Sequence, residues 1–278
     1  MKSTFGFALA LGVGLLTAGC GGGGAGGTLP AGPFMLFVQN NNTLLRYSID
    51  TGATTILGSS LINPQHIRIS PDGTKFLATI NGVLVVGSTV TGSYTNLTGY
   101  KFGDWQLNGT RILAANNGNV VHKLTTTGTS LESVFNGNFG AGISSIDCDD
   151  NSAQFLITYN VTGFAQLARV NYIGGAPTFI TSAGANYYNG RWSDDGAKVV
   201  AQTALTGDSN LAVLNADATG LTTVANTTDF EGDATFDVTN MIFYTKGNEV
   251  YSATVTGSNQ TSYFAPGGTI RLGDLYQP

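Results

Sequence analysis

The chain has 278 residues, of which 42% are hydrophobic, 10% are charged and 39 are glycine. This is enough apolar material for one large domain, and the abundance of Gly, Thr and Asn favours short strands and turns over long helices. A formal net charge of -5 makes the surface mildly acidic, which argues against nucleic acid as a partner. Beyond the first twenty residues no apolar stripe of helical spacing lasts for three turns, so we expect an all-β protein.

Residues 1–19 have the pattern of a targeting segment. Lys2 gives a positive start, residues 5–16 are an apolar run too short to span a bilayer, and small residues 17–19 lead to Cys20. This pattern resembles a bacterial lipoprotein signal. The resemblance implies cleavage before Cys20 and acylation of Cys20, which would hold the mature chain at a membrane. An ordinary secretory leader, in which Cys20 has no special part, is the alternative.

Residues 20–33 are expected to form a linker. After Cys20 the chain reads GGGGAGG, a composition that behaves as a flexible tether. Residue Gly21 is not Asp, and by resemblance to the sorting rule of Gram-negative lipoproteins this favours the outer membrane, with the domain facing the periplasm. Exposure on the cell surface is the alternative.

The rest of the chain, residues 34–278, repeats one turn phrase. It reads SPDGTK at residues 70–75 and SDDGAK at residues 193–198. An apolar residue precedes each turn and an apolar strand follows it, then a second short turn, a third strand and a Thr-Gly pair before the last strand. Asn-Gly and Asp-Gly pairs supply the positive φ of two-residue hairpins, so each unit predicts a four-stranded antiparallel meander.

The expected positions follow from this pattern. The turn residues are 36, 42, 45 and 44 positions apart: Gly73, Gly109, Asn151, Gly196 and Asn240. The apolar residues before the turns are Ile69, Trp105, Ile146, Trp192 and Phe236. The strands after the turns are expected at residues 76–80, 112–115, 155–159, 199–202 and 241–245.

A period of about 40 residues built only from strands is typical of a β-propeller. Five complete units cover residues 66–264, whereas residues 34–58 hold only three strands, at 34–39, 44–49 and 54–57. The missing innermost strand is available at residues 268–274. We therefore predict a six-bladed β-propeller with four-stranded antiparallel blades, whose first blade is closed by the C-terminal strand so that no sheet edge stays open. A β-sandwich is the alternative.

These phrases, with an aromatic residue such as Trp192 before the turn, resemble the WD40-like repeats of the TolB-type propeller. The resemblance is clearest around residues 67–80 and 190–202. It implies a six-bladed ring and agrees with the Gram-negative periplasm. Only the leader and linker precede the first expected strand, so no separate α/β domain is expected before the ring.

Catalytic motifs are scarce. The two histidines, His66 and His122, fall in different units, and the Gly-x-Ser-x-Gly motif of hydrolases is absent. We predict no catalytic residue, no metal site and no cofactor. The paired acids at 149–150 and 194–195 are interpreted as hairpin turns, with a calcium loop over residues 147–151 as the alternative to the first.

Polar residues on the innermost strands, at or near the channel mouth, form the candidate ligand site. In one interpretation their opposite charges neutralise one another around the channel. In the other, a small polar ligand such as a sugar or a peptide terminus binds at one end. The candidate residues are His66, Arg68, Asp104, Arg191, Asp233 and Arg271.

We therefore predict a membrane-anchored, non-enzymatic binding or scaffolding propeller of the bacterial cell envelope. Its partner is expected to be another envelope protein, a polar polymer or a small ligand. Aromatic residues expected to be exposed at the blade entrances, Tyr94, Tyr100, Phe102, Tyr187 and Tyr188, suggest a protein interface. The alternative is a carbohydrate- or peptide-processing enzyme with its site at the channel mouth.

Overall fold

The structure is a computed structural model that describes residues 32–106, 108–137, 142–149, 153–161, 163–182, 184–204 and 208–278. The predictions for the signal at residues 1–19 and for lipidation of Cys20 lie outside these residues. Within them, no helix is long and apolar enough to cross a membrane.

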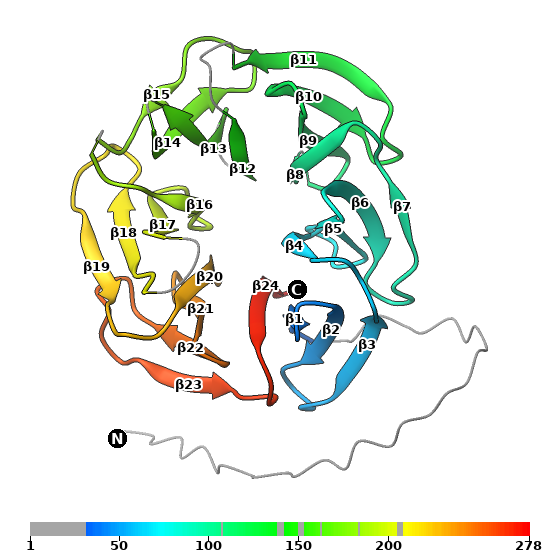
Figure 1. Cartoon of the computed structure of the whole chain (residues 1–278), viewed down its shortest axis with the longest axis vertical. Helices are drawn as coiled ribbons and strands as arrows, with labels where there is room; N and C mark the ends of the chain where they lie inside the picture. Colours follow the sequence, from blue (N-terminus) through cyan, green and yellow to red (C-terminus); the bar gives the residue numbers. More distant parts are fainter. Residues whose placement is uncertain are drawn as a thin grey trace, which may run out of the picture.

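The described chain forms six four-stranded antiparallel sheets around a central axis, as predicted (Figure 1). Blade 1 contains β24 (Ile270–Tyr276), β1 (Phe34–Gln39), β2 (Thr43–Ser48) and β3 (Thr54–Gly58). Blade 2 contains β4 (Gln65–Ile69), β5 (Lys75–Ile80), β6 (Val83–Ser88) and β7 (Tyr94–Asn96). Blade 3 contains β8 (Tyr100–Gln106), β9 (Arg111–Asn116), β10 (Val120–Thr125) and β11 (Ser130–Asn136).

The remaining blades follow the same order from the axis outward. Blade 4 contains β12 (Ile143–Cys148), β13 (Gln154–Val161), β14 (Phe164–Asn171) and β15 (Thr178–Phe179). Blade 5 contains β16 (Tyr188–Trp192), β17 (Lys198–Gln202), β18 (Leu211–Asn215) and β19 (Thr222–Ala225). Blade 6 contains β20 (Glu231–Phe236), β21 (Ile242–Lys246), β22 (Glu249–Ala253) and β23 (Thr261–Phe264).

The C-terminal strand closes the ring. β24 pairs antiparallel with β1 from Phe34↔Tyr276 to Gln39↔Ile270, so the two ends of the ring share blade 1. The register shifts by one residue at Gly273. A Cβ there would lie 2.7 Å from the Cβ of Ile67 in blade 2, which explains why glycine occupies this position.

The hairpin turns are of two kinds. Asn81 and Gly82 have φ values of 51° and 73° and join Ile80 directly to Val83, the two-residue hairpin that was predicted. The Thr-Gly turn ending at Gly92 also has a positive φ, of 72°. A Cβ on Gly92 would lie 1.8 Å from the carbonyl oxygen of Leu57 in blade 1, so this turn also sets how closely two blades approach.

The repeated phrase forms a wider turn than predicted. Ser70 N–H donates to the carbonyl of Lys75 at 2.9 Å, which leaves four residues in the connection, and Gly73 has the positive φ. The Asp72 carboxylate accepts hydrogen bonds from Ser70 Oγ and from the backbone of Thr74. A two-residue turn is therefore wrong here, because the Ser and Asp side chains stabilise a longer loop.

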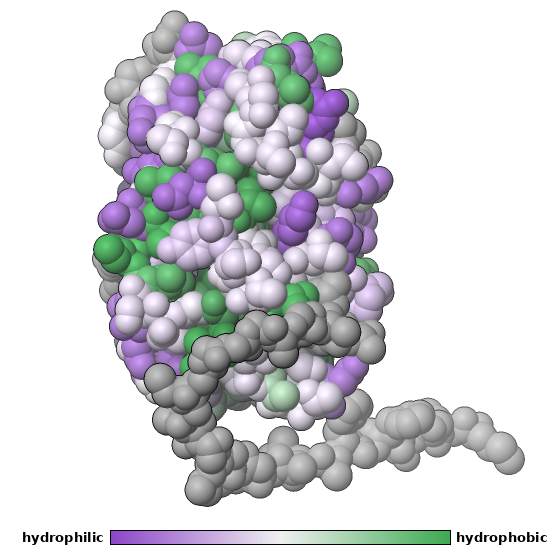
Figure 2. All heavy atoms as spheres, turned by 90° about the vertical axis from the view of Figure 1, so that its right-hand side faces the viewer, coloured by the Kyte–Doolittle hydropathy of each residue, from purple (hydrophilic) through white to green (hydrophobic). Residues whose placement is uncertain are grey.

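The core lies between the blades. Six apolar clusters occupy the six junctions of the described ring, and each joins residues of two neighbouring sheets. Phe34 of blade 1 and Phe76 of blade 2, for example, are both fully buried in one cluster. Burial of one such side chain stabilises the fold by about 1.5–3 kcal/mol. On the outer side of the ring, hydrophobic residues lie among polar ones (Figure 2).

Candidate functional site: the central channel and its two mouths

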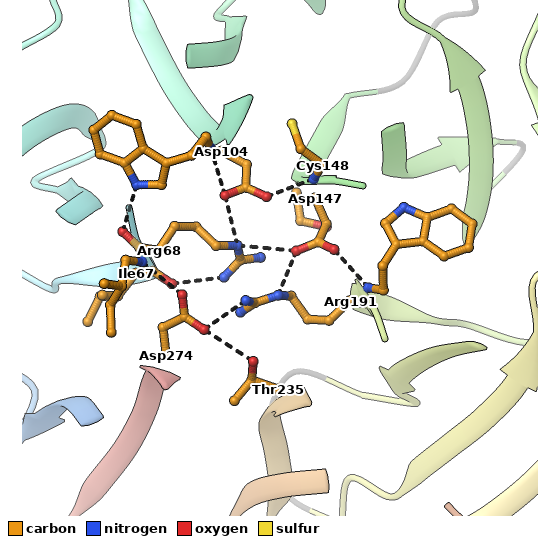
Figure 3. Close-up of polar contacts among 12 residues, drawn as sticks. Ile67, Arg68, Asp104, Asp147, Cys148, Arg191, Thr235 and Asp274 are labelled. Atoms are coloured by element: carbon orange, nitrogen blue, oxygen red, sulfur yellow. Dashed lines mark hydrogen bonds and ion pairs between the residues drawn. The ribbon is translucent and has the colours of Figure 1, made fainter. Parts of the chain in front are cut away.

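The innermost strands place one residue each around the middle of the channel (Figure 3). In each strand this residue directly precedes an apolar residue at or near the end of the strand. The six positions are therefore equivalent in the repeat. This central ring consists of Asp274, Arg68, Asp104, Asp147, Arg191 and Thr235, in blades 1 to 6 respectively.

Ion pairs connect the charged members of the central ring. Arg191 Nε lies 2.6 Å from Asp147 Oδ1, and Arg191 Nη2 lies 2.8 Å from Asp274 Oδ1. Arg68 Nε is less closely paired, at 3.5 Å from Asp147 and 3.9 Å from Asp104. The five charged side chains are only 5% to 11% exposed, so their mutual neutralisation is required for burial.

The same carboxylates join neighbouring blades. Asp274 accepts the backbone N–H of Ile69, and Asp147 accepts that of Trp192, each in the next blade. Asp104 does the same for Cys148 at 2.7 Å. The bonds to Asp274 and Asp147 are buried and that to Asp104 is partly buried, so the central ring holds three of the six junctions together.

These bonds correct one predicted position. The backbone N–H of Cys148 in blade 4 donates to a carboxylate of the preceding blade, as the N–H groups of Ile69 in blade 2 and Trp192 in blade 5 do. Cys148, and not Ile146, is therefore the equivalent residue before the turn, and Ile146 lies in an apolar cluster. The calcium-loop alternative for residues 147–151 includes residues 150 and 151, which lie outside the described residues; of its described members, Asp147 has both carboxylate oxygens bound within the channel.

The central ring holds three carboxylates and two guanidinium groups. Burial raises the pKa of Asp104 to about 7, with a further contribution from the charge of Asp147, against the opposing effect of Arg68 and Arg191. Burial would lower the pKa of Arg191, but Asp274 and Asp147 raise it above its usual value. The surplus acid is therefore Asp104, which is also the carboxylate farthest from its arginine.

The wider mouth lies on one side of the central ring and is named here the Arg271 mouth. Its cavity has a volume of about 590 Å³. A further cavity of about 30 Å³ lies between this mouth and the central ring. Its lining includes His66 and Asp233 of the mouth and Arg68 and Arg191 of the central ring, and it has room for about two water molecules. The polar residues that line the Arg271 mouth include His66, Lys101, Ser144, Asn189, Asp233 and Arg271.

Irregular backbone aims these side chains at the channel. Each innermost strand has a register shift at this level, and His66, Asn189 and Asp233 have φ values near 50° although none is glycine. Bulges of this kind redirect side chains, and positive φ values in non-glycine residues concentrate at functional sites.

Arg271 is held rigidly at the mouth. Its Nε contacts Asp233 Oδ2, its Nη2 lies 3.0 Å from Asp233 Oδ1, and its guanidinium lies 4.5 Å from the ring centre of Phe230. Gln202 in turn accepts the backbone N–H of Asp233. Within the described chain Arg271 Nη1 has no partner, so it is available to a ligand.

His66 and Lys101 follow Arg271 around the mouth, on the innermost strands of blades 2 and 3. The His66 ring lies edge-on to Phe102, and Lys101 Nζ lies 5.1 Å from the centre of the same ring. Burial, with smaller contributions from the charges of Arg68, Arg271 and Lys101, lowers the pKa of His66 to about 3. The imidazole is therefore neutral at physiological pH.

The opposite mouth is named the Trp192 mouth. Its cavity has a volume of about 410 Å³, and its floor includes the central ring. Its wall residues include Trp105, Asp149, Trp192, Asp194, Phe236 and Asp237. The two mouths thus differ in charge, because carboxylates outnumber cations in this one, whereas the Arg271 mouth has two cations, Lys101 and Arg271, and one carboxylate, Asp233.

The structure separates the six predicted site residues into two groups. His66, Asp233 and Arg271 lie together at the Arg271 mouth. Arg68, Asp104 and Arg191 lie in the central ring, where they neutralise one another and their neighbours. The sequence prediction missed Lys101, Asp147, Thr235 and Asp274. Comparison of equivalent positions in the repeat, with Cys148 aligned to Ile69, would have identified Asp147, Thr235 and Asp274.

The expected aromatic surface is only partly present. Tyr187 and Phe102 are each only 8% exposed, whereas Tyr94 is 44% exposed on β7. The prediction of exposure is wrong for Tyr187 and Phe102, because both pack into the protein.

Neither a protein-family profile nor a curated protein sequence matches the chain. Solved structures match closely in fold. TolB from Acinetobacter baumannii superposes with a TM-score of 0.68 at 17% identity, over 87% of this chain and 65% of that one. The fold is that of a TolB-type propeller. The chain spans about two thirds of the length of that TolB structure, and at this identity the likeness concerns the fold alone.

Two other structures share the fold. A chain of the nidogen/laminin complex superposes with a TM-score of 0.71 at 12% identity, over 88% of this chain and 98% of that one. An oligogalacturonate lyase in complex with manganese gives a TM-score of 0.57 at 13% identity, over 86% and 74%. Propellers of this shape therefore occur in proteins with different activities.

Proposed function

We propose that the protein is a binding or scaffolding propeller of the bacterial cell envelope, and that its partner docks at the Arg271 mouth. The observation that carries the proposal is the contrast between the central ring and this mouth. In the central ring the carboxylates are bound on both sides, whereas Arg271 Nη1, Lys101 Nζ and the His66 ring face a cavity of about 590 Å³ without a hydrogen-bonding partner in the described chain. Unused donors in a preformed cavity are what a recognition site requires.

The fold comparisons support a binding role. One match was solved in the nidogen/laminin complex and others are TolB structures. A closed ring with a rigid centre also suits this role, because it presents its mouth without a folding cost on association.

The proposed location rests on the N-terminal sequence. Cys20 would carry the lipid, and the glycine-rich residues after it would let the ring reach its partner from the membrane. By this proposal the ring faces the periplasm from the outer membrane.

Site-specific photo-crosslinking in the native envelope tests the docking surface. The crosslinking amino acid replaces Gln65 at the Arg271 mouth, Val238 at the Trp192 mouth or Thr95 on the outer strand β7. We expect one discrete adduct from position 65 and none from position 95. Adducts from position 95 or 238 without one from position 65 would place the partner elsewhere and refute the proposal.

An enzyme of carbohydrates or peptides is the second candidate. It is favoured by the match to an oligogalacturonate lyase and by the position of His66 in the wall of the Arg271 mouth. Purified protein and a His66→Gln variant should be screened on polysaccharides and peptides. Turnover by the parent that the variant lacks would establish the enzyme.

A further inference from the structure

The charges around the Arg271 mouth define the ligand more narrowly. Lys101 and Arg271 each carry one positive charge, Asp233 carries one negative charge, and His66 is neutral, which leaves one net positive charge at the cavity. Among the described residues no carboxylate forms a salt bridge with Lys101, and Asp233 occupies only two of the guanidinium nitrogens of Arg271.

The unused hydrogen-bonding groups are mainly donors. Arg271 Nη1 and Lys101 Nζ can only donate, and the Asn189 amide can donate as well. Ser144 Oγ is buried without a partner on the same cavity wall. Such a set matches a ligand that offers several acceptor oxygens and a negative charge.

The charges around the Arg271 mouth indicate how much negative charge the ligand carries. A single negative charge would neutralise the mouth, whereas a phosphate dianion would leave an excess negative charge. The central ring beneath cannot compensate for that excess, because it already has more carboxylates than guanidinium groups. A monoanion is therefore favoured over a dianion.

We propose that the Arg271 mouth binds one carboxylate group, with Lys101 Nζ and Arg271 Nη1 as its charged donors and His66 and Asn189 beside it. This inference rests on the proposed function, because it assigns chemistry to the same surface. The carboxylate belongs either to an acidic sugar or to the C-terminus of a peptide.

Calorimetric titration of the purified protein tests this with matched ligand pairs. Glucuronate is compared with glucose, and N-acetyl-trialanine with its C-terminal amide. We expect at least one carboxylate to bind, with its uncharged counterpart weaker by about tenfold, as expected when one charge-assisted hydrogen bond is lost. Binding of glucuronate alone identifies a sugar acid, and binding of the peptide acid alone identifies a peptide terminus.

Substitutions test whether the carboxylate binds at Lys101 and Arg271. Lys101→Gln should weaken binding about tenfold. Lys75→Gln, an equally exposed lysine on β5, should leave it unchanged. Lys101 is exposed, so its removal should not prevent folding. The double variant Arg271→Gln/Asp233→Asn removes both partners of the partly buried ion pair together and should abolish binding.

Several outcomes would overturn the inference: no binding of either carboxylate, equal binding of the uncharged partners, tighter binding of glucose 6-phosphate than of glucuronate, or unchanged affinity in Lys101→Gln. These failures are distinct from failure of the proposed function. A crosslink at position 65 that persists without carboxylate binding would leave a partner at the mouth that is recognised in another way.

Discussion

Asp147 binds both the side chain of Arg191, at 2.6 Å, and the backbone N–H of the next residue, Trp192, at 2.7 Å. One buried carboxylate of blade 4 therefore fixes the position of the innermost strand of blade 5 and satisfies its arginine. Asp274 and Asp104 likewise accept a backbone N–H from the blade that follows their own. The carboxylates of the channel therefore connect neighbouring blades.

Replacing Asp147 should be severely destabilising. Asp147→Ala leaves Arg191 and the Trp192 N–H without this partner in a buried site, and the expected cost is about 3–5 kcal/mol of unfolding free energy. Urea denaturation followed by circular dichroism measures it. Asp50→Ala, at an exposed acid that follows β2 in blade 1, is the control and should leave the unfolding midpoint in place. Equal midpoints for the two variants would show that the central ring does not hold the blades together.

Asp104 should make stability depend on pH. Its pKa is raised from 3.8 to about 7 on folding, so the folded state binds the proton more tightly than the unfolded state. The stabilisation is complete below pH 4 and is lost as the pH rises through about 7. Relative to Asp104→Asn, which cannot ionise, the parent protein should lose stability between about pH 4 and pH 7. Parallel pH profiles for the two proteins would contradict this assignment.

The closing strand should be essential for cooperative folding. Deleting residues 269–278 removes β24 and exposes the edge of β1, so we expect a broadened unfolding transition and aggregation. Deleting only Gln277 and Pro278, which follow β24, is the control. A long truncation that melts as sharply as the short one would mean that the ring does not depend on this closure.

Two glycines with the same backbone conformation should differ sharply in tolerance. Gly82 and Gly92 have φ values of 73° and 72°, yet a Cβ on Gly82 meets open space and one on Gly92 meets Leu57 of blade 1 at its backbone. Gly82→Ala should cost about 1–2 kcal/mol, from the left-handed conformation alone. Gly92→Ala should cost at least about 2 kcal/mol more, because the blades must move apart. Similar losses of thermal stability in the two variants would rule out the close contact.

Lipidation can be tested with the two cysteines of the chain. Cys20→Ser should abolish incorporation of a fatty-acid probe and release the protein from membranes, whereas Cys148→Ser should keep the label. Undiminished labelling of Cys20→Ser would show that Cys20 is not the lipidated residue, and a parent protein without label would favour the ordinary secretory leader.

The repeat predicted the fold well because blades are built from local signals. A turn phrase, an apolar strand and a second turn lie close together in sequence, and even the distant closure by residues 268–274 was predictable from counting strands. The strand boundaries were within two residues for β1, β2 and β3. The width of the Asp72-Gly73 turn was missed because side-chain hydrogen bonds from Ser70 and Asp72, not backbone φ alone, determine it.

The site was harder to predict because it depends on how strands from different blades face one another. Arg68 and Arg271 are both arginines on innermost strands, yet one is buried in the central ring and the other faces a cavity. A one-residue bulge at Gly273 separates Arg271 from Asp274, and such a shift leaves no clear mark in a single sequence. The neutrality of His66 likewise follows from its surroundings and not from its spacing.

β1 lies between β24 and β2, and it begins at Phe34, immediately after the N-terminal segment. Tension applied along this strand from its N-terminal end would load two ladders in shear at once, and all their hydrogen bonds would resist together. If the strand lay at a sheet edge, the same force could unzip it one bond at a time. The closure of the ring thus gives mechanical strength to the strand that follows the N-terminal segment.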